Sequence, residues 1–163
     1  MNKYYRILDK ILVAGKTQTN KKGNIQYLLN EQLSLAPADL LDIFEGHNIA
    51  RKKLRSELQL FMQGERNVEK YREAGINWWD YCGSILVNSY PTYFEKLPPL
   101  IAKINREKRN SKNYVLFLGE TGAESNQAPC LSLVQFQLDD GELVLSAYQR
   151  SSDANLGLPS DIY

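Results

Sequence analysis

Residues 131–149 read LSLVQFQLDDGELVLSAYQ, a pattern that predicts two β-strands joined by a tight turn. The dipeptide Asp140-Gly141 between two largely apolar runs is a strong signal for a hairpin. Residues that pair across a hairpin centred near residue 140 have numbers that sum to about 280, so Cys130 falls opposite Arg150. The two ends of the hairpin are therefore expected to bring together Cys130, Arg150, Ser151 and Asp153.

This neighbourhood has two chemical interpretations. A thiol beside a fixed cation has its thiolate form stabilised, and the thiolate is the nucleophile. An arginine followed by a serine also suits a phosphate, because it offers two parallel donors and a hydroxyl. The alternative is that Cys130 is a buried structural cysteine and that Arg150 pairs with Asp153. Spacing alone leaves both interpretations open.

The two predicted strands carry apolar side chains on both faces. By residue parity, one set contains Leu131, Leu133, Leu143 and Leu145, and the other contains Val134, Phe136, Leu138 and Val144. A sheet that is apolar on both sides must be covered on both sides. We therefore expect the chain's own helices on one face and a second copy of the chain on the other.

Elsewhere, apolar spacing and turn residues outline the remaining elements. The expected helices are residues 3–14, 49–63, 66–74 and 98–109. The polar, basic stretch 16–24 is expected to be a loop, residues 25–35 an extended segment, and residues 106–113 a surface connection. Residues 114–119, YVLFLG, are typical of a buried strand.

Composition narrows the class of protein. The chain has 163 residues, of which 43% are hydrophobic and 24% charged, as in an ordinary single globular domain. Its 20 basic and 19 acidic residues give no electrostatic reason to expect nucleic acid or an anionic membrane as a partner. No run is long and apolar enough for a membrane helix or a signal peptide. Two cysteines and the single His47 make a disulfide framework, a zinc site and a Ser/His triad improbable, and favour a soluble, cytoplasmic, reduced protein.

Several motifs, in their order along the chain, resemble the thymidylate synthase family, which includes the pyrimidine nucleotide hydroxymethylases. The most specific are APC at 128–130 and YQRSSDANLGLP at 148–159. Weaker matches are SELQLFMQG at 56–64, INWWDYC at 76–82 and VNSYPTY at 87–93. The resemblance implies an α+β fold, a mixed sheet layered with helices, in one domain over residues 1–163 whose sheet packs face to face in a homodimer.

The resemblance also implies catalytic roles. Cys130 would be the nucleophile that adds to C6 of the pyrimidine, Glu57 would organise water and proton transfers, and Tyr90 would belong to the same proton network. C5 of a pyrimidine is a poor nucleophile until addition at C6 makes it a carbanion equivalent. It can then attack the one-carbon unit of 5,10-methylenetetrahydrofolate, the implied cofactor. An acid that shuttles protons works best in apolar surroundings, and Glu57 lies on a leucine-rich helix.

Binding roles follow in the same way. The resemblance assigns the nucleotide and its phosphate to Lys21, Gln149, Arg150, Ser151 and Asp153. It assigns the folate to Trp79, Asp153, Leu156 and Gly157. In the family, two adjacent arginines from the partner subunit also grip the phosphate. Lys112 and Asn113 stand in their place here, so this contribution is expected to be weaker.

Three other departures stand out. Leu131 follows the cysteine where the family often has histidine, and Ser160 replaces an aromatic residue that packs on folate. The sequence ends at Tyr163, whereas relatives continue through a large C-terminal segment. On this comparison the chain is expected to be the N-terminal portion of an enzyme, C-terminally incomplete.

Asp161 is the most informative departure, because thymidylate synthases have an asparagine there that reads O4 and N3–H of uracil. A carboxyl group reverses the hydrogen-bond demand and suits the N4 amino group of cytosine, as in the cytidylate hydroxymethylases. The sequence thus favours folate-dependent one-carbon transfer to C5 of a pyrimidine nucleoside monophosphate, with dCMP as substrate and Asp161 as base reader. The alternatives are a thymidylate synthase acting on dUMP and an inactive remnant that only binds nucleotide or a partner chain.

Overall fold

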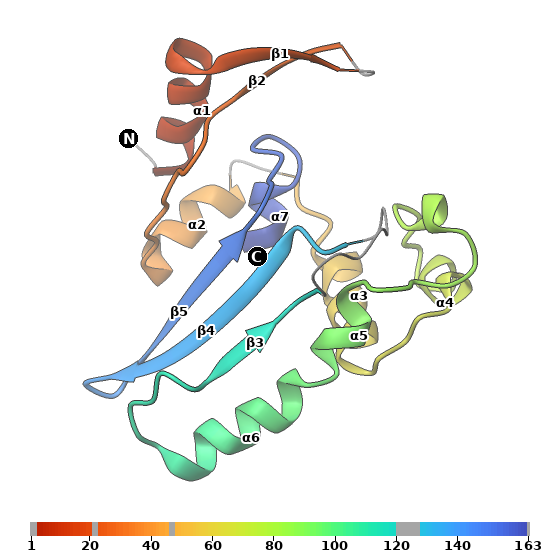
Figure 1. Ribbon diagram of the computed structural model, residues 1–163, viewed down its shortest axis with the longest axis vertical. Helices are drawn as coiled ribbons and strands as arrows, with labels where there is room; N and C mark the ends of the chain where they lie inside the picture. The colour runs from red at the N-terminus through yellow and green to blue at the C-terminus, as the bar shows by residue number, and fades with distance from the viewer. Residues whose placement is uncertain (1–2, 21–22, 46–47, 120–127, 163) are drawn as a thin grey trace. The chain divides into compact units, whose positions relative to one another are not determined.

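The computed structural model describes residues 3–20, 23–45, 48–119 and 128–162. Its helices and small sheets confirm the α+β class (Figure 1). The chain divides into two compact units. The first unit consists of Met1–Ala50 and Ser152–Tyr163, and the second unit is Arg51–Ser151.

The first unit combines both ends of the chain. Its elements are α1 (Lys3–Ala14), β1 (Lys16–Asn20), β2 (Gly23–Tyr27), α2 (Pro37–Glu45) and α7 (Leu158–Ile162). Tyr4, Ile43 and Pro159, from α1, α2 and α7, are fully buried. The Tyr4 hydroxyl donates to the carbonyl oxygen of Ala154 at 2.8 Å. This bond ties the segment just before α7 to the N-terminal helix.

The prediction of a loop at residues 16–24 is wrong. Residues 16–20 form β1, which pairs antiparallel with β2 so that Thr17 lies opposite Gln26. β-Branched threonines at alternate positions favour extended backbone. The strands have almost no apolar side chains on either face, so the usual hydrophobic alternation was absent. Lys21 and His47 lie outside the described residues.

The second unit contains the predicted helices. They are α3 (Arg51–Met62), α4 (Val68–Glu73) and α6 (Leu97–Glu107), and the structure adds a short 3-10 helix η1 (Asp80–Cys82) and α5 (Tyr90–Phe94). Gly64 and Gly75 follow α3 and α4 with φ of 69° and 75°, a left-handed conformation that ends a helix at low cost for glycine. Figure 1 shows α6 alongside β3.

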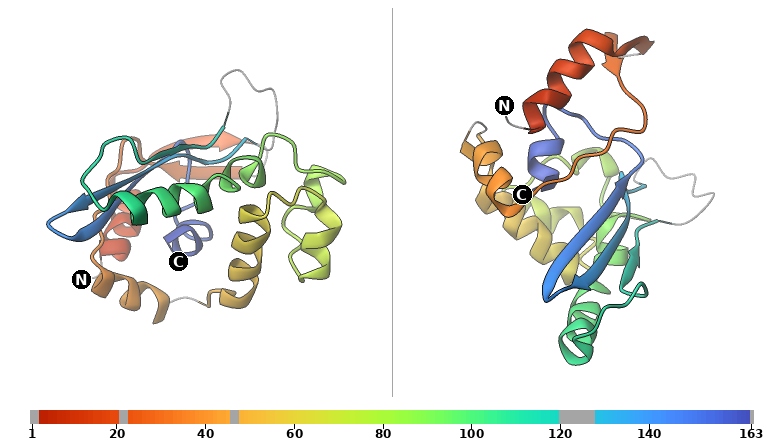
Figure 2. Two further views of the ribbon diagram at one scale, coloured as in Figure 1. Left: turned by 90° about the horizontal axis from the view of Figure 1, so that it is seen from below. Right: turned by 90° about the vertical axis from the view of Figure 1, so that its left-hand side faces the viewer.

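The sheet of the second unit has three strands, β3 (Val115–Phe117), β4 (Leu131–Asp139) and β5 (Glu142–Gln149), in the order β3-β4-β5. Figure 2 shows the long β4–β5 hairpin from two further directions. Asp140 and Gly141 have φ of 47° and 85°, the two positive values that a type I′ turn requires. The predicted hairpin is confirmed. Within the described residues every strand pair is antiparallel, so the expected mixed sheet is not seen there.

A bulge at the start of β4 changes which side chains share a face. Leu131 pairs with Gln149, but Leu133 pairs with Tyr148, with an irregularity between the two pairs. This shift by one residue applies only to the Cys130 end of the hairpin. From Leu133 to the turn, the two-residue connection Asp140-Gly141 places odd-numbered residues of one strand opposite even-numbered residues of the other, so the grouping by simple parity is wrong. Cross-strand pairing groups Leu143 with Leu138 and Leu145 with Phe136.

One face of this sheet packs on helices. Leu116 of β3 and Val134 of β4 lie opposite each other and are 4% and 7% exposed. They belong to a cluster with Tyr93 and Leu118, against which Leu97 and Leu100 of α6 also pack. Phe94 of α5 joins this cluster to a second one, built on Phe61, Val68, Tyr71, Ile76 and Leu86.

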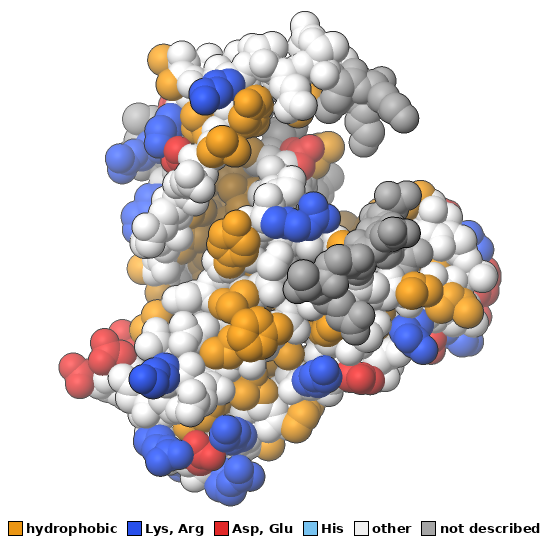
Figure 3. Space-filling model, viewed as in Figure 1, with side chains coloured by type: hydrophobic (Ala, Val, Ile, Leu, Met, Phe, Trp, Pro, Cys, Tyr) orange, Lys and Arg blue, Asp and Glu red, His pale blue; other side chains and the backbone are white. Residues whose placement is uncertain are grey.

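The other face of the sheet carries an apolar row. Phe117, Leu133 and Tyr148 pair across the three strands, and Phe117 and Tyr148 are 67% and 63% exposed. The strand expected to be buried at 114–119 is thus buried on one side only. Figure 3 shows hydrophobic side chains gathered over the sheet. Isolated apolar side chains are ordinary on a surface, but a continuous row indicates a surface that binds something.

Candidate active site

Cys130 lies at the end of the hairpin predicted for it. The backbone N–H of Arg150 donates to the carbonyl oxygen of Cys130 at 2.9 Å, which confirms that the two residues are opposite each other. Cys130 immediately precedes β4, and Arg150 immediately follows β5. The tight turn and the two strands therefore fix the backbone of both residues.

The guanidinium of Arg150 holds the segment that leads into Cys130. Its Nε donates to the carbonyl oxygen of Pro129 at 3.1 Å, and its Nη2 donates to that of Ala128 at 2.9 Å. These contacts attach the arginine to the Ala-Pro-Cys motif. A guanidinium has five N–H donors, so two such bonds leave capacity for an anionic ligand.

Tyr90 supports Cys130 from the other side. Its hydroxyl oxygen accepts the backbone N–H of Cys130 at 3.1 Å and that of Leu131 at 3.2 Å. These two amides stand where the bulge begins, so they are not both satisfied by a regular ladder. Tyr90 and Arg150 therefore bind the backbone on both sides of the thiol.

Glu57 is buried, at 9% exposure, rather than lying at the rim of its helix. Its Oε1 atom accepts the indole N–H of Trp78 at 2.6 Å and that of Trp79 at 2.5 Å. The buried carboxylate is satisfied by hydrogen bonds from neutral donors, as a polar group in an apolar environment must be. The family resemblance gave a role to Trp79 and none to Trp78. The signal that sequence reasoning missed was the acid on the neighbouring helix.

Phe61 connects the carboxylate to the cysteine. It lies one helical turn after Glu57, and its ring centroid is 5.3 Å from that of Tyr90 and 6.0 Å from that of Trp79. Phe61 therefore packs against both Tyr90, which binds the backbone of Cys130, and Trp79, which binds Glu57. Cys82 packs against the same cluster. Burial raises the pKa of the Cys82 thiol, so at neutral pH it is a poor nucleophile.

Trp79 also offers an aromatic surface. Its ring stacks on Tyr81 with centroids 6.4 Å apart and an interplanar angle of 28°. Tyr81 is 69% exposed, so one side of this pair reaches solvent. An exposed stacked pair suits a flat conjugated ligand ring.

Gln149 lies in this region, but Lys112 does not. Gln149 pairs with Leu131, the residue after the cysteine, and Ser151 is exposed just beyond Arg150. The carbonyl oxygen of Lys112 accepts the side-chain amide of Gln135 at 3.0 Å. Five residues of extended strand, about 16 Å, separate Gln135 from Cys130. Lys112 therefore lies well away from Cys130 along the strand.

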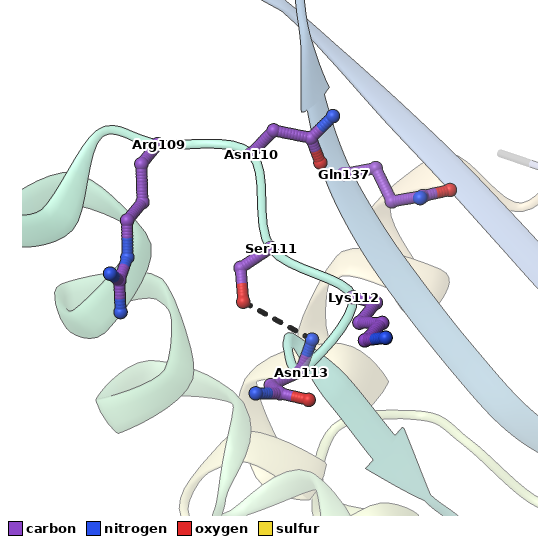
Figure 4. A pocket seen from close by; sticks show the side chains of 6 residues that line it. All are labelled: Arg109, Asn110, Ser111, Lys112, Asn113 and Gln137. Carbon is purple, nitrogen blue, oxygen red and sulfur yellow. Dashed lines mark hydrogen bonds between the residues drawn. The ribbon is translucent and has the colours of Figure 1, made fainter.

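Lys112 lines a separate surface hollow at the loop between α6 and β3 (Figure 4). The lining residues are Arg109, Asn110, Ser111, Lys112, Asn113 and Gln137. Ser111 Oγ accepts the backbone N–H of Asn113 at 3.2 Å and shapes the turn. The hollow is polar and basic, which suits an anion.

The first unit contains the other predicted residues. Asp153 Oδ1 accepts the backbone N–H groups of Asn155 and Leu156 at 3.0 and 2.9 Å, and the Asp153 carbonyl accepts that of Gly157 at 3.0 Å. Asp153 therefore builds the turn that starts α7. A Cβ on Gly157 would lie 3.3 Å from the Asp153 carbonyl oxygen, so the turn is closely packed there. Asp161 is exposed on α7, and Leu156 is 75% exposed.

Comparison with known protein families gives one clear result. A family model described as thymidylate synthase matches residues 2–163 of the chain. Among the helices that the structure describes, none has the length and hydrophobicity needed to cross a membrane.

Proposed function

The chain belongs to the thymidylate synthase family, enzymes that transfer a one-carbon unit to C5 of pyrimidine nucleotides, and we propose that it hydroxymethylates dCMP. The observation that carries the proposal is the fixed position of Cys130, with Arg150 and Tyr90 bonded to the backbone around it. Asp161 gives the preference for cytosine over uracil.

Cys130 acts first. Its thiolate adds to C6 of the pyrimidine ring, and the electron pair of the C5–C6 double bond makes C5 nucleophilic. C5 then forms a bond to the one-carbon unit and loses its hydrogen as a proton. Departure of the tetrahydrofolate nitrogen then leaves an exocyclic methylene on C5. In a hydroxymethylase, water adds to that methylene while the thiolate leaves C6, which restores the C5–C6 double bond. Because the backbone of Cys130 is fixed on both sides, little reorganisation opposes the first step.

Glu57 and Tyr90 take part in proton transfer. A carboxylate held by two indoles in a buried cluster can take a proton and return it through water in the site. Tyr90 belongs to the same cluster through Phe61 and reaches the backbone of Cys130. These arrangements support the roles that the family resemblance gives to Glu57 and Tyr90.

The residues that would bind folate fit a flat, polar ring system. The family uses 5,10-methylenetetrahydrofolate, which supplies the one-carbon unit in an electrophilic form. The exposed Trp79–Tyr81 stack offers an aromatic face for it. The family resemblance also gives folate roles to Asp153, Leu156 and Gly157, which in the first unit form a closely packed turn with an exposed apolar side chain.

The phosphate of the nucleotide would be bound by Arg150, Ser151 and Gln149, with Lys21 from the stretch before β2. Lys112 would contribute from a second copy of the chain, which its distance from Cys130 in its own chain supports. The nucleotide and the folate are then the small-molecule partners, and the chain itself is the protein partner.

Substitution of Asp161 with asparagine should move base preference toward dUMP. An aspartate carboxylate facing O4 of uracil sets acceptor against acceptor, whereas the N4 amino group of cytosine supplies a donor. An unpaired buried polar group costs roughly 1–3 kcal/mol, so the ratio of kcat/KM values for dCMP and dUMP should fall by about ten- to a hundredfold. Competition between the two nucleotides measures this ratio.

Asp139→Asn, an exposed residue at the tip of the hairpin, is the matched control and should leave the ratio unchanged. If Asp161→Asn also leaves it unchanged, Asp161 does not read the base. A preference of the unaltered chain for dUMP would instead favour a thymidylate synthase.

The apolar row on the sheet should be the interface of a homodimer. Phe117, Leu133 and Tyr148 form a continuous strip that pairs well with a copy of itself about a twofold axis. Replacing Tyr148 with lysine places a charge in that interface and should raise the Kd of the dimer by at least about tenfold. Sedimentation over a range of concentrations measures it.

Val13→Lys serves as the control, because Val13 is an equally apolar residue, 88% exposed, on α1. It should leave the Kd unchanged. An unaltered chain that sediments as a monomer at all concentrations would contradict the homodimer.

A further inference from the structure

Two adjacent indoles converge on a single oxygen. Trp78 and Trp79 are the two tryptophans of the sequence, and both donate their Nε1–H to Oε1 of Glu57, at 2.6 and 2.5 Å. Neighbouring side chains usually point in different directions. Here Trp79 has a helical backbone conformation, with φ of −95° and ψ of 0°, at the start of η1. The turn brings both rings to the same acceptor.

The arrangement makes the two oxygens of the Glu57 carboxylate unequal, because only Oε1 accepts the two indoles. A carboxylate oxygen has two lone pairs, and the two indoles occupy both of them on Oε1. Donors of this kind stabilise the ionised form, and they draw negative charge toward the oxygen that accepts them. A proton taken up by Glu57 must then be carried by Oε2, because protonation at Oε1 would break an indole bond.

We propose that Trp78 is a positioning residue that, together with Trp79, holds Glu57 ionised and confines its proton exchange to Oε2. The catalytic consequence rests on the proposed function, in which Glu57 relays protons to and from the pyrimidine. The stabilisation of ionised Glu57 by the two indoles is a property of the folded chain and does not depend on turnover. The family motif accounts for Trp79 and Glu57 but gives no role to Trp78.

Other titratable groups lie around Glu57, among them the carboxylate of Glu65, whose charge also acts on Tyr71, and that of Asp80, which pairs with Arg72. Tyr71 of α4 interacts with the charge of Glu57, and burial, followed by that charge, raises the pKa of the phenol. Tyr90 of α5 and Cys82 of η1 lie in the same aromatic cluster, and burial raises the pKa of Cys82. On α3 itself, Lys53 lies one turn before Glu57. The Glu57→Gln variant therefore identifies which acidic transition belongs to Glu57.

Tryptophan fluorescence directly tests the effect of the two indoles on the ionisation of Glu57. Emission of the unaltered chain should change with pH in one acidic transition, which Glu57→Gln abolishes and Asp80→Asn retains. Asp80 is the control because it follows Trp79 in sequence and pairs with Arg72 instead. In Trp78→Phe, with Trp79 as the reporter, the transition should move to higher pH by roughly one unit, the effect of losing one charge-assisted hydrogen bond.

The Trp79→Phe variant provides the complementary reading, because Trp78 is then the reporter and its emission should still follow Glu57. A transition that stays at the same pH in Trp78→Phe, or that is absent in Trp79→Phe, would overturn the proposal.

Kinetic measurements distinguish the effect of Trp78 on the ionisation of Glu57 from the proposed role of Glu57 in catalysis. In Trp78→Phe the acid limb of the kcat profile for tritium release from 5-tritiated dCMP should move by the same amount, with KM for dCMP unchanged. A fluorescence shift without the matching kinetic shift would overturn the proton-transfer role. If the unaltered chain releases no tritium but shows the fluorescence transitions, the proposed function is wrong. The effect of Trp78 on the ionisation of Glu57 is then still supported.

Discussion

Replacing Cys130 with serine should lower tritium release from 5-tritiated dCMP by at least about a thousandfold. A serine hydroxyl is not ionised at neutral pH and is a far weaker nucleophile than a thiolate. The backbone bonds from Arg150 and Tyr90 involve main-chain atoms of residue 130, so the substitution preserves them. The loss should therefore appear in kcat while the fold and nucleotide binding are retained.

Cys82→Ser is the matched control, because Cys82 is the other cysteine of the sequence and packs on the same aromatic cluster. Its activity should stay within about threefold of the unaltered chain, since a serine fits the space of a cysteine and burial already keeps the Cys82 thiol protonated. Equal losses in the two variants would show that neither thiol is the nucleophile.

Replacing Phe61 with alanine should lower the free energy of unfolding by about 3–5 kcal/mol. Phe61 is 8% exposed and contacts the rings of Tyr71, Trp79, Tyr90 and Phe94. Removing it opens a cavity between the helix of Glu57 and the helix of Tyr90. Urea denaturation followed by circular dichroism measures the change.

Leu58→Ala on the same helix is the control. Leu58 is 42% exposed, so its loss should cost no more than about 1 kcal/mol. Similar losses for the two variants would mean that the aromatic cluster does not organise this unit. Because Phe61 separates the two halves of the site, we also expect Phe61→Ala to lower activity in the fraction that stays folded.

The hairpin could be predicted because its information is local. Asp140-Gly141 determines the turn, and counting outward from it brings Cys130 to within one residue of Arg150. The bulge beside Leu131 could not be predicted, because it depends on amides that Tyr90 binds from a distant helix. The bulge shifts the pairing by one residue and places Cys130 opposite Arg150, whereas the grouping by parity failed because the two-residue turn pairs odd-numbered with even-numbered positions.

Other features depend on contacts that periodicity does not reveal. The burial of Glu57 depends on two tryptophans that lie 21 and 22 residues later in the sequence. Residues 16–20 form a strand with no apolar face, so their pairing partner, β2, stabilises the extended conformation. Helices α5 and α7 have five residues each, too few for a helical repeat to be visible. The single domain expected for residues 1–163 stays a prediction.

Tritium release by the unaltered chain tests the central claim most directly. Addition at C6 followed by substitution at C5 must release the hydrogen of C5 into water, whichever group completes the reaction. With 5,10-methylenetetrahydrofolate present, we predict release from 5-tritiated dCMP that exceeds release from 5-tritiated dUMP. A folded chain that releases tritium from neither nucleotide would contradict the account.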